Sequence, residues 1–222
     1  MNPKGVYAHT GVGHDIRMPA LALSNRISAR RSVTVTPPAD SAVLAQALKA
    51  ARWPGVALPP TMVFESAVIP VVSYTGARHR VERGDGPVLD LATVGLWEAC
   101  PTLSSPPSPL RITGFIATAK ARARAVRQVA SLSGLGAGMV IARHQLKPIS
   151  LLDADASGVW VVGISPAEPS ARVWVTGRAG AVSTARRVPL TRLMEEALFD
   201  LALRHDLLED APSHVRVGTP LT

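Results

Sequence analysis

Three closely spaced glycines, Gly134, Gly136 and Gly138, are the sharpest local feature of the chain that could carry chemistry. A dinucleotide-binding fold needs such glycines after a strand and before a helix, whereas the flanking pattern here predicts them after a helix and before a strand. A P-loop needs a Gly-Lys-Ser/Thr sequence next, and none follows. Two interpretations remain. Either backbone without Cβ atoms lets phosphates or bases approach closely, or Gly134 ends a helix in the left-handed conformation.

Histidines and carboxylates give weaker signals. The six histidines form no His-x-x-x-His or Glu-x-x-His group, so we expect no metal site and no cofactor. His144 could serve as the general base of an RNA-cleaving enzyme, although a lone histidine on a strand is more often structural. Asp153 and Asp155 would bind a hard cation if they shared one face of a strand, and otherwise decorate a turn.

The single cysteine, Cys100, excludes a disulfide-built secreted module and a cysteine-rich zinc site. It favours a reducing, cytoplasmic location. No uninterrupted apolar run reaches the length of a membrane span, so we expect no membrane partner.

The charge of the chain is uneven. The 222 residues include 24 Lys and Arg against 16 Asp and Glu, a formal net charge of +8, and no acidic residue lies between Glu98 and Asp153. The basic residues of this acid-free window are Arg111, Lys120, Arg122, Arg124, Arg127, Arg143 and Lys147. Most are arginines, whose planar guanidinium pairs with phosphate. The window therefore predicts a surface that binds a polyanion, with nucleic acid the first choice.

The elements that position these residues divide at a proline-rich linker, 101–109. Before it we expect an irregular basic N-terminal arm, 1–40, and a first α+β subdomain, 41–100. That subdomain begins with a helix from Ser41 to Trp53, which apolar residues at helical spacing indicate. A strand over Met62–Tyr74 follows, and then a loop or projecting hairpin that carries Arg78, His79 and Arg80. A strand or short helix over Val88–Trp97 ends it.

The second α+β subdomain is expected over 110–222. Alternation predicts a strand over Leu110–Ile116, and the period then changes to that of a helix, which places Lys120, Arg124 and Arg127 on one face. The glycine loop and a strand from Met139 follow. Two further strands, Val159–Ile164 and Arg172–Thr176, are predicted to form a hairpin.

Pro189 is predicted to open the last helix of this subdomain. Its apolar stripe would pack on the sheet. Glu195, Glu196 and Asp200 would then point outward.

The order of strand Leu110–Thr118, basic helix Ala119–Leu132, glycine-rich loop and strand Met139–Lys147 resembles the RAMP superfamily of CRISPR-associated proteins, in particular Cas5-like subunits. The resemblance covers about 40 of the 222 residues. It implies an α+β fold with a ferredoxin-like, RRM-related antiparallel sheet and packed helices. It also implies RNA contacts from Gly134, Gly136 and Gly138, although the basic and aromatic residues usual among these glycines are replaced by Leu135 and Ala137.

The same resemblance implies phosphate contacts from Arg124 and Arg127, and a basic thumb at Arg78 and Arg80. From sequence we therefore expect a non-catalytic RNA-binding subunit of a ribonucleoprotein, which the resemblance specifies as guide-RNA binding in a CRISPR effector complex with other protein subunits. Lys120 and Arg143 complete the expected RNA contacts. Three alternatives stay open: a module that docks an acidic protein, a metal-independent endoribonuclease centred on His144, and binding of DNA in place of RNA.

Overall fold

The computed structural model describes residues 41–100, 102–103, 105–117, 122–144, 147–165, 170–185 and 188–208. The expected N-terminal arm, 1–40, and Lys120 lie outside these residues. The strands are β1 (Val56–Ala57), β2 (Thr61–Val63), β3 (Ser66–Tyr74), β4 (Leu110–Ala117), β5 (Ala137–Ala142), β6 (Val159–Ile164) and β7 (Ala171–Val175). The helices are α2 (Ser41–Ala51), α3 (Ala77–Glu82), α4 (Leu91–Ala99), α5 (Arg122–Ala130), α6 (Pro148–Ala156) and α7 (Pro189–Arg204).

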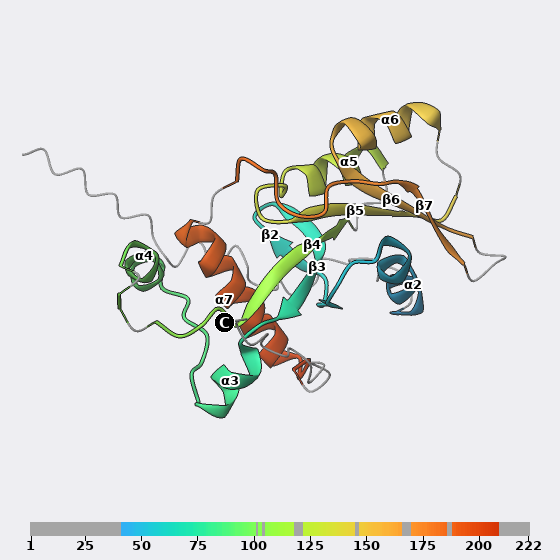
Figure 1. Cartoon of the computed structure of the whole chain (residues 1–222). Coiled ribbons are helices and arrows are strands. Elements are labelled where there is room, and N and C mark those ends of the chain that lie inside the picture. The colour runs from blue at the N-terminus through green and yellow to red at the C-terminus, as the bar shows by residue number, and fades with distance from the viewer. Residues whose placement is uncertain are drawn as a thin grey trace, which may run out of the picture.

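The strands form one sheet in the order β1-β3-β4-β5-β6-β7, with β2 also paired to β3 (Figure 1). The expected α+β class is confirmed. The sheet is nevertheless mixed and not antiparallel throughout, because β4 pairs parallel to β5 and β5 parallel to β6. Helices α5 and α6 make these two connections, and a helical crossover returns the chain in the same direction. β3 from the first expected subdomain pairs with β4 from the second, so the two share one sheet.

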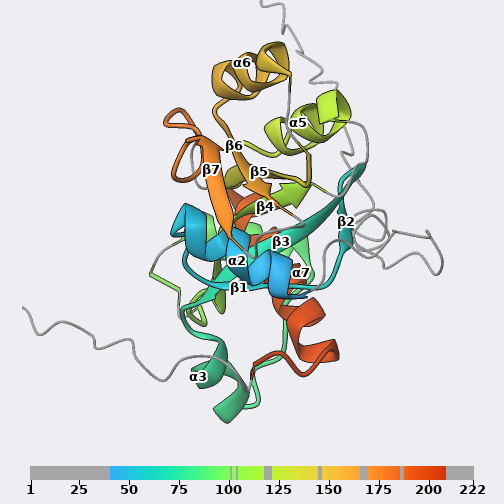
Figure 2. The ribbon, with the colours of Figure 1, turned by 90° about the vertical axis from the view of Figure 1, so that its right-hand side faces the viewer.

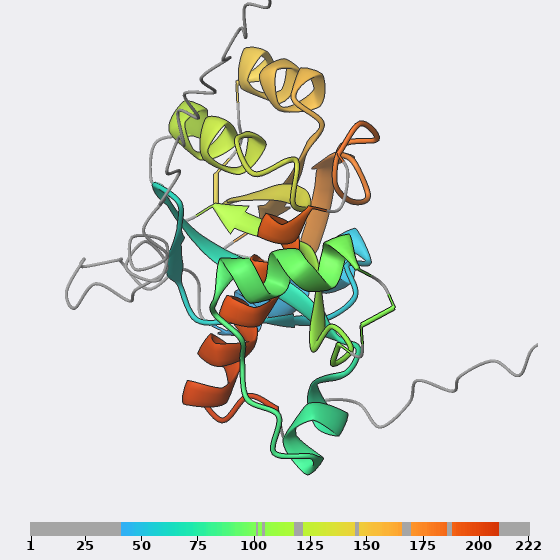
Figure 3. The same cartoon turned by 90° about the vertical axis from the view of Figure 1, so that its left-hand side faces the viewer.

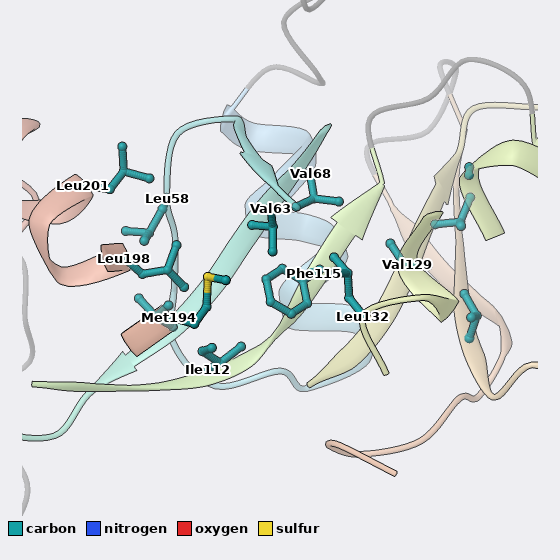
Figure 4. Packing of buried hydrophobic residues seen from close by; sticks show 14 of the residues in the cluster. Leu58, Val63, Val68, Ile112, Phe115, Val129, Leu132, Met194, Leu198 and Leu201 are labelled. Atoms are coloured by element: carbon teal, nitrogen blue, oxygen red, sulfur yellow. The ribbon is translucent and has the colours of Figure 1, made fainter. Parts of the chain in front are cut away.

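Helices cover both faces of the sheet (Figure 2). On one face, α5, α6 and α7 pack through buried residues such as Val129, Ala154 and Leu198. Figure 4 shows how Val129 and Leu132 approach the sheet beside Phe115. On the other face, α2 buries Ala47 and Ala51 in a second cluster. In Figure 3, α4 lies across α7 on the outer side of that helix.

The predicted strand over Met62–Tyr74 is two strands. A turn at Phe64 and Glu65 separates β2 from β3, and Phe64 adopts a positive φ of 52°. Pro70 lies within β3, where it lacks the N–H that a neighbouring strand would need. β1 pairs with Val71 and Val72, and β2 pairs with Ser66 to Val68, so Pro70 falls in the gap between these partners. Pro70 is thus accommodated in β3 although this strand has partners on both sides.

The predictions for α2, β4, α5, the β6–β7 hairpin and α7 are confirmed to within a few residues. Two others were wrong. The expected loop or hairpin around Arg78 is the helix α3, and Asp153 and Asp155 belong to the helix α6. Pro148 occupies the first turn of α6, where its missing N–H costs nothing. The region of Val88–Trp97 forms the helix α4, one of the two options.

Candidate nucleic-acid interface

The parallel strands give the sheet two distinct ends. At the carboxyl end, where β4 and β5 finish, Arg143 and His144 follow β5 and Lys147 precedes α6. All three side chains are exposed. Ligands of open sheets with parallel strands commonly bind outside the carboxyl ends of the strands. The sequence-predicted residue Arg143 therefore lies where such a sheet presents its binding surface.

Arg124 and Arg127 of α5 are exposed beside a cavity of about 490 Å³. The turn between β2 and β3 forms the opposite wall and contributes Glu65. Val68, just beyond this turn, pairs with Ala117, the last residue of β4, so the cavity also belongs to the carboxyl end. Among the described residues, neither arginine makes an ion pair within 4.0 Å. An acidic residue, Glu65, therefore lies near these arginines in the folded protein, although none is near them in the sequence. Both guanidinium groups are still available to an anion.

Gln128 lies in the same cavity and was missed by the sequence reasoning. Its amide Nε2 donates a hydrogen bond of 2.6 Å to the carbonyl oxygen of Ala67. Its Oε1 atom is buried and has no hydrogen-bond partner in the described part of the chain. A buried acceptor without a donor is costly. The cavity therefore offers two cationic donors, and Gln128 lines it with its unsatisfied oxygen buried.

Arg80 cannot contact RNA in this structure. Its side chain is 0% exposed, and its guanidinium pairs with Glu196 at 2.9 Å. It also donates to the carbonyl oxygens of Asp85, Gly86 and Pro107. Helix α3 thus directs Arg80 inward as a structural residue, and the expectation that it belongs to a basic thumb was wrong.

Arg78 and His79 of α3 are exposed. Arg78 forms an i,i+4 ion pair with Glu82 at 3.0 Å. Such a pair is worth little to stability at a surface, but it offsets the charge that a phosphate would meet. Helix α3 is therefore a poorer anion site than α5.

The three glycines have different roles. A Cβ atom on Gly138 would lie 2.9 Å from Val129 Cγ2, and one on Gly136 would lie 3.1 Å from Gly114 Cα. Both residues are buried, so they allow close packing of the loop against α5 and β4 and offer no surface to RNA. The expectation of RNA contacts from these two glycines was wrong.

Gly134 differs, because a Cβ atom there would meet nothing within 4 Å. It is exposed and lines a second, larger cavity at the opposite end of the sheet. Its φ lies outside the left-handed region, so the alternative of a left-handed helix end was also wrong.

Helix α7 contributes to a buried network of charged side chains that its sequence pattern did not predict. Glu196 is 0% exposed and Glu195 is 3% exposed, although both were expected to point outward. Glu196 accepts hydrogen bonds from Arg80, from Arg192 and from the backbone N–H of Val88. Arg192 also donates to the carbonyl oxygens of Pro106 and Pro107. The network therefore ties the proline-rich segment to α7 and is fully occupied with structural contacts.

The other candidate residues show no constellation for catalysis. His144 is exposed after β5, and Asp153 and Asp155 are exposed on α6. Within the described ranges, no group of three His, Cys, Asp or Glu side chains could hold a metal ion. In the same ranges, no helix is long and apolar enough to cross a bilayer.

Comparisons with family models, with curated proteins and with solved structures found no match to this chain.

Proposed function

We propose that this protein binds RNA without cleaving it, as a subunit of a ribonucleoprotein, and that the carboxyl end of the sheet is its RNA-binding surface. The observation that carries the proposal is the pair Arg124 and Arg127, exposed on one helix beside a cavity and without an ion-pair partner among the described residues. Guanidinium groups in this state pair with the phosphates of the RNA backbone.

Neighbouring side chains extend this surface. Arg143 and Lys147 add two exposed cations at the same end of the sheet. The hydrogen bond from Gln128 Nε2 to the carbonyl oxygen of Ala67 holds the start of β3 against α5 and so fixes the shape of the cavity. A single-stranded RNA presents its bases to such a cavity once they are unstacked. Phosphate contacts then position the strand and the cavity admits one base.

The test is the salt dependence of RNA affinity. Fluorescence anisotropy with a labelled single-stranded RNA is measured across a series of KCl concentrations for the wild type and for the double variant Arg124→Ala/Arg127→Ala. Each lost phosphate contact lowers the slope of log K against log salt by a little under one unit. We expect the double variant to bind more weakly and its slope to fall by about one to two units.

The matched control removes the same charge elsewhere. Lys49 of α2 and Arg172 of β7 are both exposed, and α2 packs on β7 on the opposite face of the sheet. The variant Lys49→Ala/Arg172→Ala should keep the wild-type slope. Equal losses of RNA affinity in the two double variants would mean that only the net charge matters, and would contradict the proposal. The absence of RNA binding by the wild type would contradict it as well.

His144 distinguishes binding from cleavage. We expect the wild type to leave labelled RNA intact and His144→Ala to bind it with nearly unchanged affinity. Cleavage by the wild type that His144→Ala abolishes would replace this proposal with the endoribonuclease. Tight binding of an acidic protein with no RNA affinity would replace it with the docking module.

The more specific expectations stay predictions. The parallel pairing of β4, β5 and β6 counts against a ferredoxin-like arrangement. A place in a CRISPR effector complex, with guide RNA as the ligand, rests on the resemblance to Cas5-like subunits. The arginine contacts of α5 to phosphate do not depend on either.

A further inference from the structure

The larger cavity lies at the amino end of the sheet, away from the proposed RNA surface. Its volume is about 1010 Å³, at the upper end of the range usual for small-molecule sites. The first residues of β4, the loop before β5 and the start of β6 line it through Arg111, Gly134 and Trp160. The end of α2, the segment 179–185 after β7 and the first turns of α7 also line it.

Among the described residues, two cations line this wall. Arg52 follows α2 and Arg111 is the second residue of β4, and both are exposed. In the described ranges, neither has a carboxylate within 4.0 Å. Arg52 adopts a positive φ of 54°, a conformation that an L residue rarely takes. The cavity therefore offers two guanidinium groups to an anionic ligand.

Three hydroxyl groups of the cavity offer acceptors, because their protons are already used. Thr113 Oγ1 donates to the carbonyl oxygen of Pro54, and Thr75 Oγ1 donates to that of Ser108. Ser108 Oγ donates at 2.5 Å to the buried carboxylate of Glu195. A hydroxyl whose proton is used still has lone pairs to accept with. These three hydroxyls therefore suit a part of the ligand that donates, as sugar hydroxyls do.

An aromatic ring completes the arrangement. Trp160 lines the cavity, and its indole N–H donates to the carbonyl oxygen of Arg178 at 2.7 Å. Trp53 packs against it edge to face, with ring centroids 6.4 Å apart. These contacts fix the orientation of the half-buried ring at the cavity wall.

We propose that the cavity at the amino end binds a nucleoside monophosphate. Arg52 and Arg111 hold the phosphate, the hydroxyl wall accepts hydrogen bonds from the ribose, and the base stacks on Trp160. The ligand is a free small molecule, and its site shares no side chain with the RNA surface on α5. The inference therefore stands or fails independently of the proposed function.

The experiment is isothermal titration calorimetry of the whole protein with adenosine monophosphate. Adenosine and ribose 5-phosphate are the comparison ligands, because they lack the phosphate and the base respectively. We expect adenosine monophosphate to bind at least 10-fold more tightly than either fragment. Equal affinity for ribose 5-phosphate would overturn the assignment of a nucleotide in favour of a sugar phosphate, and no binding of any of the three would overturn the site.

Variants locate the ligand. Arg111→Ala should weaken adenosine monophosphate binding about 10-fold or more, whereas Arg172→Ala, which removes an exposed arginine from β7 outside the cavity, should leave it unchanged. Equal losses in these two variants would overturn the proposal. Loss of nucleotide binding in Arg124→Ala/Arg127→Ala, with Arg111→Ala unaffected, would move the nucleotide to the RNA surface and overturn it as well.

Gly134→Leu tests the cavity without removing a charge. The added side chain meets no atom within 4 Å at its Cβ and projects at the cavity wall, so the melting temperature should not change. We expect adenosine monophosphate binding to fall about 10-fold, and Gly134→Ala to retain most of it. Wild-type affinity in Gly134→Leu would contradict the proposed position of the ligand.

Discussion

The two ends of the sheet differ in how their residues are distributed along the chain. At the carboxyl end, the cations come from one continuous stretch, with Arg124 and Arg127 on α5 and Arg143 after β5. At the amino end, the cavity takes Arg52, Arg111 and Glu195 from segments that lie far apart in the sequence. A surface built from consecutive residues leaves a composition signal. The larger cavity leaves a much weaker signal, because only Arg111 of these three residues belongs to the acid-free window.

The largest expected effect is a loss of stability that should be felt more at the amino end of the sheet than at the carboxyl end. Glu196→Gln removes the negative charge that holds Arg80 and Arg192 and leaves two buried cations without their partner. Breaking a buried pair in this way costs about 3–5 kcal/mol. The network ties Pro106 and Pro107 to α7, next to Ser108, which lines the cavity at the amino end. In Glu196→Gln, amide hydrogen exchange should therefore accelerate more at the amino end of the sheet than in α5.

Urea denaturation followed by tryptophan fluorescence gives the free energy of unfolding of Glu196→Gln. A loss below about 1 kcal/mol would mean that the network contributes less than buried pairs usually do. Uniform acceleration of exchange at both ends would show that the molecule opens as a single unit.

The glycines before and within β5, at the amino end of the sheet, should show the next largest effect. Gly138→Val places a side chain against Val129 of α5 in a region without free space, which costs about 1–3 kcal/mol. Gly134→Ala, four residues earlier, adds a methyl group where nothing lies within 4 Å and should leave stability unchanged or slightly raised. Thermal unfolding of both variants measures this contrast, and similar melting temperatures for the two would contradict the division of roles between these glycines.

The smallest effect concerns a residue at neither end. Asp90 caps α4 and accepts hydrogen bonds from the hydroxyl and backbone N–H of Thr93, which lower the pKa of its carboxyl below the ordinary value. A lowered folded-state pKa stabilises the protein above the ordinary pKa of aspartate, and this contribution disappears as the pH falls through the lowered value. Asp90→Asn should therefore be slightly less stable than the wild type at neutral pH, and the difference should shrink in acid.

Chemical denaturation of Asp90→Asn and the wild type over a series of pH values tests this dependence. A stability difference that grows as the pH falls would have the wrong sign. RNA and nucleotide affinities of Asp90→Asn should match the wild type, which makes this variant the baseline for changes at either end of the sheet.

Local patterns in the sequence were sufficient for much of the fold. The alternation from Leu110 and the helical spacing around Val126 and Val129 predicted β4 and α5, because each element buries one face of its own. Helix α3 escaped prediction because its short, mostly polar sequence has no apolar period. The parallel pairing of β4, β5 and β6 could not be inferred either, since it depends on which strands become neighbours.

Burial of charge was the least predictable property. Glu196 occupies a position that the sequence pattern assigns to the polar face of α7. Its burial depends on Arg80, 116 residues earlier, together with Arg192 and the backbone N–H of Val88. The role of Gln128 was likewise not predictable, because it depends on a contact between α5 and the start of β3, which are distant in the sequence. Arg124, Arg127 and Arg143 were found from sequence because exposed arginines need no distant partner to be recognised.

The outer strands of the sheet bear on how the protein behaves at high concentration. On one side the last partners are β1 and β2, of two and three residues. On the other side β7 has a register shift against β6, with Trp174 left over between paired residues and packed on Gly163, and it carries the exposed Arg172. Very short strands, bulges and charges all hinder edge-to-edge pairing of sheets between molecules. The described edge strands therefore carry the features that hinder fibrillar aggregation.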